Sequence, residues 1–116
     1  MIKYDEYELI EFFGNIPEKI DDKDGLKYSF FKPQSDFSLI INVYDKSDSV
    51  IITLKWKQKI LFHGFYTGIN EIVKNQEKTL TIKQKNSKMI ILKDKVDYYS
   101  IITGIEENAY DLYFRY

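Results

Sequence analysis

Residues 37–57 run FSLIINVYDKSDSVIITLKWK, and this stretch decides the fold class. In its first half every second residue falls on one apolar face of a strand, namely Phe37, Leu39, Ile41 and Val43. The second half repeats the alternation with Val50, Ile52, Leu54 and Trp56. Between the halves lies the polar sequence DKSD, which is typical of a turn. The pattern predicts a β-hairpin with one buried face.

Similar short apolar segments recur along the chain and predict further strands, at 26–32, 59–66, 79–85, 89–93, 98–103 and 109–116. The segment 69–73 fits either a strand or a single helical turn. We therefore predict an α+β, mostly β fold. A short N-terminal helix precedes an antiparallel sheet of about seven short strands, which form a sandwich or partial barrel.

The N-terminal segment carries the signals of a helix. Asp5 is a suitable N-cap, and Glu8 three residues later completes a capping box. Leu9 and Phe13 are four residues apart and predict the buried face. Gly14 can adopt the left-handed conformation that ends a helix.

Length and composition are those of one globular domain spanning residues 1–116, with 44% hydrophobic and 30% charged residues. The absence of cysteine excludes disulfides, thiolate metal sites and cysteine nucleophiles. The start of the sequence lacks a signal-peptide pattern, and no apolar run is long enough to span a membrane. These observations predict a cytoplasmic protein.

The net charge of −1 hides an uneven distribution along the chain. Residues 1–52 carry six Lys and eleven acids, whereas residues 53–95 carry ten Lys and three acids. If these segments separate in space, the molecule has an acidic and a basic side. The densest acidic stretch is EKIDDKDG at 18–25, and it predicts a surface for a basic partner such as a toxin domain, formed by Glu18, Asp21, Asp22 and Asp24.

The acidic stretch at 18–25 has two other interpretations. A calcium loop of the EF-hand type would place Ile20 and Phe31 at positions that require acidic ligands, so no metal site is predicted. A solvated turn, in which Asp24 and Gly25 lead into the next strand, is the simpler explanation of the sequence.

The residue inventory predicts no enzyme. His63 is the only histidine, it lies among apolar residues, and no neighbour in the sequence supplies the group that orients a general base. Phosphate-binding loops and paired Cys/His motifs are also missing. We therefore expect no catalytic residues and no cofactor, and a protein-binding module instead.

Lysines 55, 57 and 59 flank Trp56, and this pattern supports an alternative function. Basic residues interleaved with aromatic ones bind single-stranded nucleic acid by charge and stacking. The alternation nevertheless directs Trp56 towards the core and the lysines towards water. Nucleic-acid binding through the basic segment 53–95 stays open as the alternative.

The sequence also resembles a known group of proteins. EFFGNIPEKID, followed by KYSFF, SLIINVYDKSDSVIITL and TLTIKQK, is similar to small bacterial β-rich immunity proteins of polymorphic and contact-dependent toxin systems. The resemblance covers the pattern of residues 11–92 and includes few fixed letters, chiefly residues 11–14 and Pro17. It implies a cytoplasmic inhibitor that plugs a toxin active site, and it carries over no functional residue.

The last segment, 109–116, has aromatic residues on both faces of its predicted strand. An edge strand of this kind can pair with a second copy across a two-fold axis, which predicts a possible homodimer through 109–116. The competing explanation is a strand inside the sheet with both faces covered.

Overall fold

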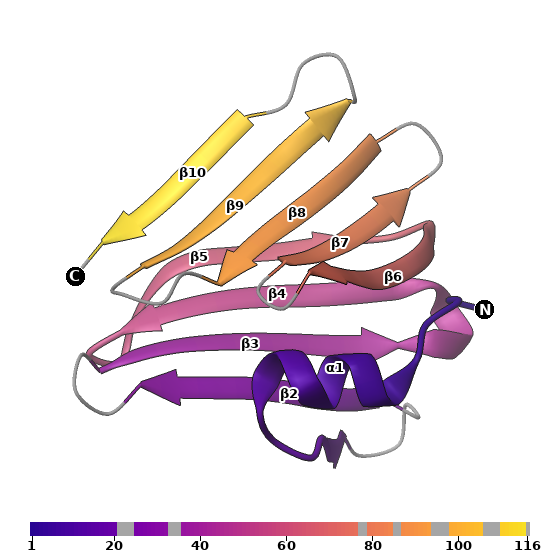
Figure 1. Ribbon diagram of the computed structural model, residues 1–116, viewed down its shortest axis with the longest axis horizontal. Helices are drawn as coiled ribbons and strands as arrows, with labels where there is room; N and C mark the ends of the chain where they lie inside the picture. Colours follow the sequence, from indigo (N-terminus) through magenta and orange to yellow (C-terminus); the bar gives the residue numbers. More distant parts are fainter. Residues whose placement is uncertain are drawn as a thin grey trace.

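The computed structural model describes residues 1–20, 25–32, 36–76, 79–84, 87–93, 98–105 and 110–115. One helix precedes a succession of antiparallel strands in two five-stranded sheets (Figure 1). The elements are α1 (Glu6–Phe13), β1 (Glu18–Ile20), β2 (Gly25–Lys32), β3 (Phe37–Tyr44), the 3₁₀ turn η1 (Asp45–Ser47), β4 (Ser49–Trp56), β5 (Lys59–Tyr66), β6 (Ile69–Gln76), β7 (Thr79–Gln84), β8 (Ser87–Lys93), β9 (Tyr98–Ile105) and β10 (Tyr110–Arg115).

The predicted fold class is confirmed. One sheet has the order β1-β2-β3-β4-β5 and the other β10-β9-β8-β7-β6, so each sheet consists of strands that are consecutive in the sequence. The described strands number ten because two segments beyond the predicted set are extended. The first is β1, which belongs to the acidic stretch expected to be a turn, and the second is β6, where the sequence left strand and helix undecided.

The β3–β4 hairpin forms in the predicted register. Leu39 lies opposite Leu54, and Ile41 lies opposite Ile52. All four side chains are fully buried. Each such burial contributes about 1.5–3 kcal/mol relative to exposure. This hairpin therefore supplies one wall of the core, as the alternation predicts.

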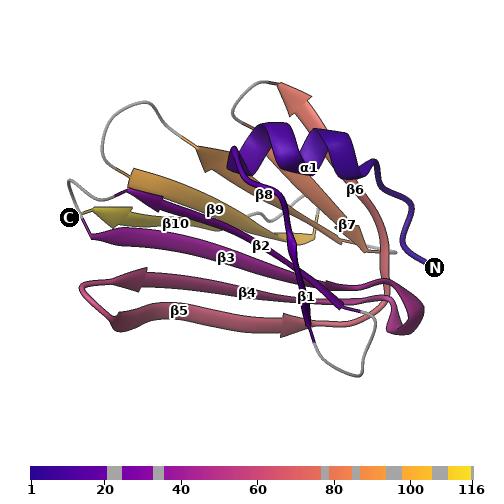
Figure 2. The ribbon, with the colours of Figure 1, turned by 90° about the horizontal axis from the view of Figure 1, so that it is seen from below.

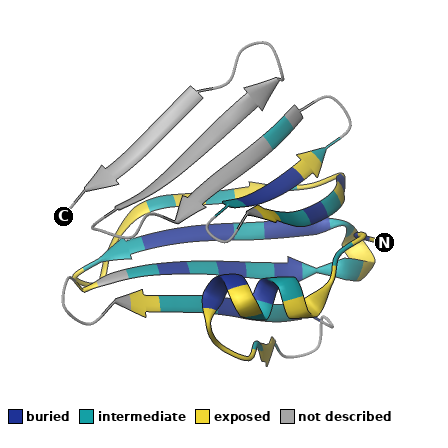
Figure 3. Ribbon diagram, in the orientation of Figure 1, coloured by how far each residue is buried: buried dark blue, intermediate teal, exposed yellow. Residues whose placement is uncertain are grey.

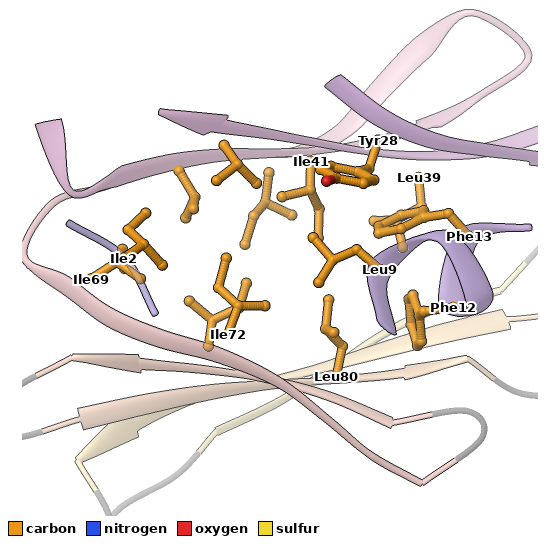
Figure 4. Packing of buried hydrophobic residues seen from close by; sticks show 14 of the residues in the cluster. Ile2, Leu9, Phe12, Phe13, Tyr28, Leu39, Ile41, Ile69, Ile72 and Leu80 are labelled. Atoms are coloured by element: carbon orange, nitrogen blue, oxygen red, sulfur yellow. The ribbon is translucent and has the colours of Figure 1, made fainter. Parts of the chain in front are cut away.

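The core lies between the two sheets and the helix (Figure 4). Tyr28, Leu39 and Ile41 project from one sheet, and Ile72 and Leu80 approach from the other. A third group of side chains closes the side of the core where the helix lies, namely Leu9, Phe12 and Phe13 of α1.

The predicted ends of α1 are confirmed. The Asp5 carboxylate accepts a hydrogen bond of 2.8 Å from the backbone N–H of Tyr7. Gly14 has φ 74°, and its N–H donates to the carbonyl of Ile10 at 2.7 Å. The helix is closed by this left-handed glycine, a conformation that costs a residue with a Cβ about 1–2 kcal/mol.

The rest of the helix prediction needs two corrections. The Glu8 carboxylate does not turn back to complete a capping box, because it accepts a hydrogen bond from the backbone N–H of Lys74 in β6 at 3.3 Å. The buried face also includes Phe12, which is only 1% exposed. Both differences arise because α1 packs between β2 and β6, a tertiary arrangement that local spacing does not reveal.

The N-terminal residues continue this cover along β6. Lys3 forms a parallel bridge with Glu71, in which the Lys3 N–H donates to the Asn70 carbonyl and the Ile72 N–H donates to the Lys3 carbonyl, both at 3.0 Å. The preceding residue is held too, since the Ile2 N–H donates to the Asp45 carboxylate at 2.7 Å. The free edge of β6 is therefore occupied by the chain itself.

The strand β10 lies at the opposite end of the same sheet. It pairs with β9, with Leu112 opposite Ile101, and the order of the described strands ends there. The explanation that 109–116 lies inside the sheet is therefore wrong at the level of the backbone, because β10 is an edge strand. The homodimer through this segment stays a prediction.

Candidate functional site

The strand β5 ends the other sheet, and three of its exposed side chains are apolar. Within the described strands it pairs with β4 alone. Ile60 and Phe65 are each 61% exposed and Leu61 is 39% exposed. Figure 3 shows the strand as mostly exposed, and Figure 2 places it on the side of the molecule away from α1. Exposed apolar residues gathered on one strand indicate a contact surface.

The cross-strand register continues this surface over the outer face of the sheet. Three rows of outward side chains run from β5 towards β2. The rows are Phe65–Ile51–Asn42–Lys27, His63–Thr53–Ile40–Ser29 and Ile60–Lys55–Ser38–Phe31. We call this set the outer face. Directly opposed side chains in a sheet lie about 4.5–5.5 Å apart at Cβ, so the apolar Ile60 and the basic Lys55 are immediate neighbours on it.

A bulge and a tight turn shape one end of the outer face. The register shifts between Leu54 and Lys55, which leaves Leu61 as the additional residue of β5. The turn that follows β4 places both Lys57 and Gln58 at positive φ, 49° and 67°. Such a two-residue turn matches the right-handed twist of the hairpin, although glycine and asparagine adopt it at lower cost.

The same end contains a hollow of ≈ 290 Å³, lined by Phe31, Asp36, Ser38, Lys55, Lys57 and Gln58. The Lys57 N–H donates to the Asp36 carbonyl at 3.1 Å and fixes the turn against the β2–β3 connection. The Lys57 ammonium lies 4.9 Å from the centre of the Trp56 ring. Two lysines and one carboxylate therefore surround a hollow beside exposed aromatic carbon.

His63 lies in the middle row of the outer face and is exposed. Its Nδ1 is 3.0 Å from the Thr53 hydroxyl, directly across the strand pair. A hydroxyl orients the imidazole but does not stabilise its cationic form as a carboxylate does. The neighbouring Gly64 allows close approach, because a Cβ there would lie 2.5 Å from the Tyr66 ring.

The predicted separation into acidic and basic sides does not hold around β6, where lysines pair with acids. The Lys74 ammonium lies 2.7 Å from the Glu11 carboxylate, and Lys83 lies 3.3 Å from Glu71. Lysines of the segment 53–95 are thus divided between two sheets, and these two are paired with acids. Among the described residues, three lysines of the segment lie together on the β4–β5 hairpin, namely Lys55, Lys57 and Lys59.

The acidic residues predicted as a partner surface lie apart from this hairpin. Glu18 is exposed on β1 and stands opposite Lys27 in the register with β2. Asp21, Asp22 and Asp24 lie outside the described residues. The exposed residues of β5 were missed in the sequence, although KILFHGFY carries apolar residues at both alternating positions, as a strand with two apolar faces does.

The described residues contain no group of three or more His, Asp or Glu side chains arranged to hold a metal ion. Their single α-helix is too short and too polar to cross a membrane.

Comparison with known proteins gives one informative result. No protein-family profile matches the chain, and no curated protein matches it in sequence. A chain in the solved structure of a contact-dependent growth inhibition toxin–immunity protein complex from Klebsiella pneumoniae 342 has a similar fold, with a TM-score of 0.62. The likeness covers 97% of each chain at 14% sequence identity. The resemblance seen in the sequence is thus confirmed as a likeness of fold.

Proposed function

We propose that this chain is an immunity-type inhibitor, which binds a bacterial toxin domain in the cytoplasm and blocks it by covering its surface. The observation that carries the proposal is the likeness of fold, along nearly the whole of both chains, to a chain of a toxin–immunity protein complex. A fold alone does not specify an activity, so the site must supply the remaining support.

The outer face favours the role of the inhibitor over that of the toxin. An enzymatic toxin needs titratable groups that converge on a substrate, whereas an inhibitor needs a complementary surface. Here the imidazole of His63 faces the hydroxyl of Thr53, and the other titratable groups of the rows are lysines. Exposed apolar side chains beside polar and basic ones are typical of protein interfaces.

The rigidity of the sheet supports the same role. The outward side chains lie on four paired strands, and the inner faces of the middle two are fully buried at Leu39, Ile41, Ile52 and Leu54. A pre-organised surface loses little conformational entropy on binding, which favours a tight complex.

The test takes the product of the gene next to that of this chain as the toxin candidate and asks whether the chain neutralises it. The neighbouring gene product should be expressed from an inducible promoter, alone and together with the chain, while growth is followed. We expect growth arrest alone, rescue on co-expression, and an equimolar complex on gel filtration. Arrest that persists with folded chain present, or two proteins that elute separately at micromolar concentrations, would contradict the proposal.

Nucleic-acid binding is the second candidate, because Lys55, Lys57 and Lys59 lie together at the turn of the β4–β5 hairpin, whose strand β5 also carries the exposed Phe65. It predicts that the affinity for an oligonucleotide falls steeply with salt, since each phosphate contact releases counterions. Fluorescence anisotropy at low and moderate salt measures this directly. A chain that does not bind oligothymidylate at low salt removes this candidate.

A further inference from the structure

We propose that the outer face, at its β4–β5 side, is the docking surface and that its occupant is an acidic protein surface with aliphatic side chains. The inference rests on the proposed function, because it names the surface and the chemistry of the partner. It differs from the sequence-based prediction, which placed partner binding on the acidic stretch and assumed a basic partner.

The apolar part of the surface argues for a protein partner. Ile60, Leu61 and Phe65 are exposed on β5, and Ile51 and Ile40 continue the apolar area inward with partial exposure. Strands of eight residues at about 3.3 Å per residue, four abreast at about 4.8 Å, give roughly 500 Å². That is the same order as the about 800 Å² that one partner contributes to a standard interface.

The charged part of the surface specifies the sign of the charge that the partner's surface must carry. Among the outward side chains of β2–β5 in the described residues, the charged groups are Lys27 and Lys55, and none is a carboxylate. Lys57 and Lys59 add two positive charges at the hairpin turn, and Glu18 faces Lys27 at the β1 margin. Because like charges across an interface cost free energy, a basic protein surface is rejected here. A second copy of this face is rejected for the same reason.

The hollow provides the most specific contact. Lys55 and Lys57 outnumber the single carboxylate of Asp36, and Phe31 contributes apolar wall. A carboxylate of the partner that enters the hollow meets the side chains of Lys55 and Lys57 beside an apolar wall, where charge-assisted hydrogen bonds are stronger than in open water. An Asp or Glu of the partner is therefore the expected occupant of the hollow.

The aromatic residues argue against single-stranded nucleic acid as the occupant. Stacking requires exposed rings, but three aromatic residues of the hairpin pack against the core, namely Trp56, Phe62 and Tyr66. The exposed rings of the outer face are Phe65 and Phe31 at opposite margins of the sheet, and aliphatic side chains lie between them.

A first experiment tests the surface without the toxin. The NMR chemical shifts of the backbone amides of the full chain are recorded during titration with a soluble synthetic peptide of alternating Glu and Leu. A matched peptide of alternating Lys and Leu and an oligothymidylate are the controls. We expect shifts confined to β4, β5 and the hollow with the acidic peptide alone, and their loss as salt rises. No shifts, equal shifts with the basic peptide, or larger shifts with oligothymidylate would overturn the proposal.

A second experiment uses the toxin complex and matched variants. Phe65→Ser and Lys55→Glu should each weaken the complex by about tenfold or more, as centrally placed interface residues do. Tyr7→Ser is the control, because Tyr7 is an aromatic residue that is more exposed than Phe65 (77% against 61%) and belongs to α1, on the other side of the molecule. Urea unfolding of every variant shows whether the variant is folded, so that weakened binding is not mistaken for a loss of folding.

The outcomes separate the two proposals. If the wild-type chain neither binds nor neutralises the toxin, the proposed function fails, and the peptide experiment still decides the surface. If the wild-type chain binds but Phe65→Ser and Lys55→Glu bind equally well, the surface is wrong although the function stands. Weakening by Tyr7→Ser or Glu18→Lys instead would place the interface on α1 or on the acidic stretch.

Discussion

The edges of β5 and β6 are treated differently although these strands follow one another in the sequence. The edge of β6 is occupied at three successive alternate residues, Asn70, Ile72 and Lys74, by hydrogen bonds with Lys3 and Glu8. The β5 edge ends its sheet with Ile60 and Phe65 exposed. Exposed apolar edges invite aggregation and are normally covered or charged. The exposed apolar residues of β5 are therefore consistent with the proposed docking surface.

The largest difference between the two sides should appear when matched phenylalanines are truncated. Phe12→Ala removes a ring buried between α1 and the sheets, so it should lower the free energy of unfolding by about 3–5 kcal/mol. Phe65→Ala removes an exposed ring and should change it by less than about 0.5 kcal/mol. Urea unfolding measures both. Similar losses for the two variants would show that β5 is covered like β6.

Removing the cover from β6 should have a smaller, local effect. Glu8→Ala leaves the Lys74 N–H without its acceptor and should cost about 1–2 kcal/mol. Glu8→Gln retains a carbonyl acceptor and should cost less. Amide exchange at Lys74, with the buried Ile82 as reference, locates the effect. Unchanged exchange at Lys74 in the alanine variant would mean that Glu8 does not protect this edge.

The β5 side offers a stabilising change in its turn. Gln58 has φ 67°, which glycine adopts without strain, so Gln58→Gly should raise the free energy of unfolding by about 0.5–1 kcal/mol. Gln58→Ala is the matched control, since it shortens the side chain but keeps the Cβ. Thermal unfolding compares the three proteins. A gain with alanine equal to that with glycine would assign the effect to the side chain instead of the backbone.

The smallest effect at neutral pH concerns two buried tyrosines. Burial raises the pKa of the Tyr28 hydroxyl well above its usual value, and the nearby Tyr4 and Glu6 raise it further, while burial alone raises the pKa of Tyr66. The folded chain holds these protons when the unfolded chain loses its own near about pH 10. The stabilisation is therefore complete below that pH and decreases as the pH rises above it.

Tyr28→Phe tests this directly, because it keeps the ring and removes the titration. Urea unfolding of this variant and of Tyr66→Phe should show a gain over the wild type only above about pH 10, larger for position 28. Parallel curves for the wild type and the Tyr28 variant at all pH values would contradict the burial of this hydroxyl.

Local signals in the sequence predicted the local structure well. Alternation at residues 37–57 gave the β3–β4 pairing, and Asp5 and Gly14 marked the ends of α1, because each depends on residues within a few positions. Glu8 was misjudged because its hydrogen-bond partner Lys74 lies 66 positions away, in β6. Phe12 was missed because it packs into a core that is shared with residues of both sheets. Spacing within a helix carries no information on such partners.

The candidate site was predicted less well, for a related reason. The exposed apolar residues of β5 have the same residue types as a buried strand, and only the order of strands in the sheet shows that Ile60 and Phe65 remain uncovered. Counting charges by segment likewise missed that Lys74 and Lys83 pair with acids. Of the predicted acidic surface, Glu18 is described, and its role stays a prediction.

The sequential order of strands in both sheets has a consequence for folding kinetics. Every strand pairs with its sequence neighbour, so the hairpins form by short-range contacts that close quickly. Docking α1 on β6 instead closes a loop of 66 residues at the Glu8–Lys74 hydrogen bond, at an entropic cost of about 4 kcal/mol. We expect the helix to dock after the rate-limiting step. Substitutions in α1 should then accelerate unfolding and leave the refolding rate nearly unchanged.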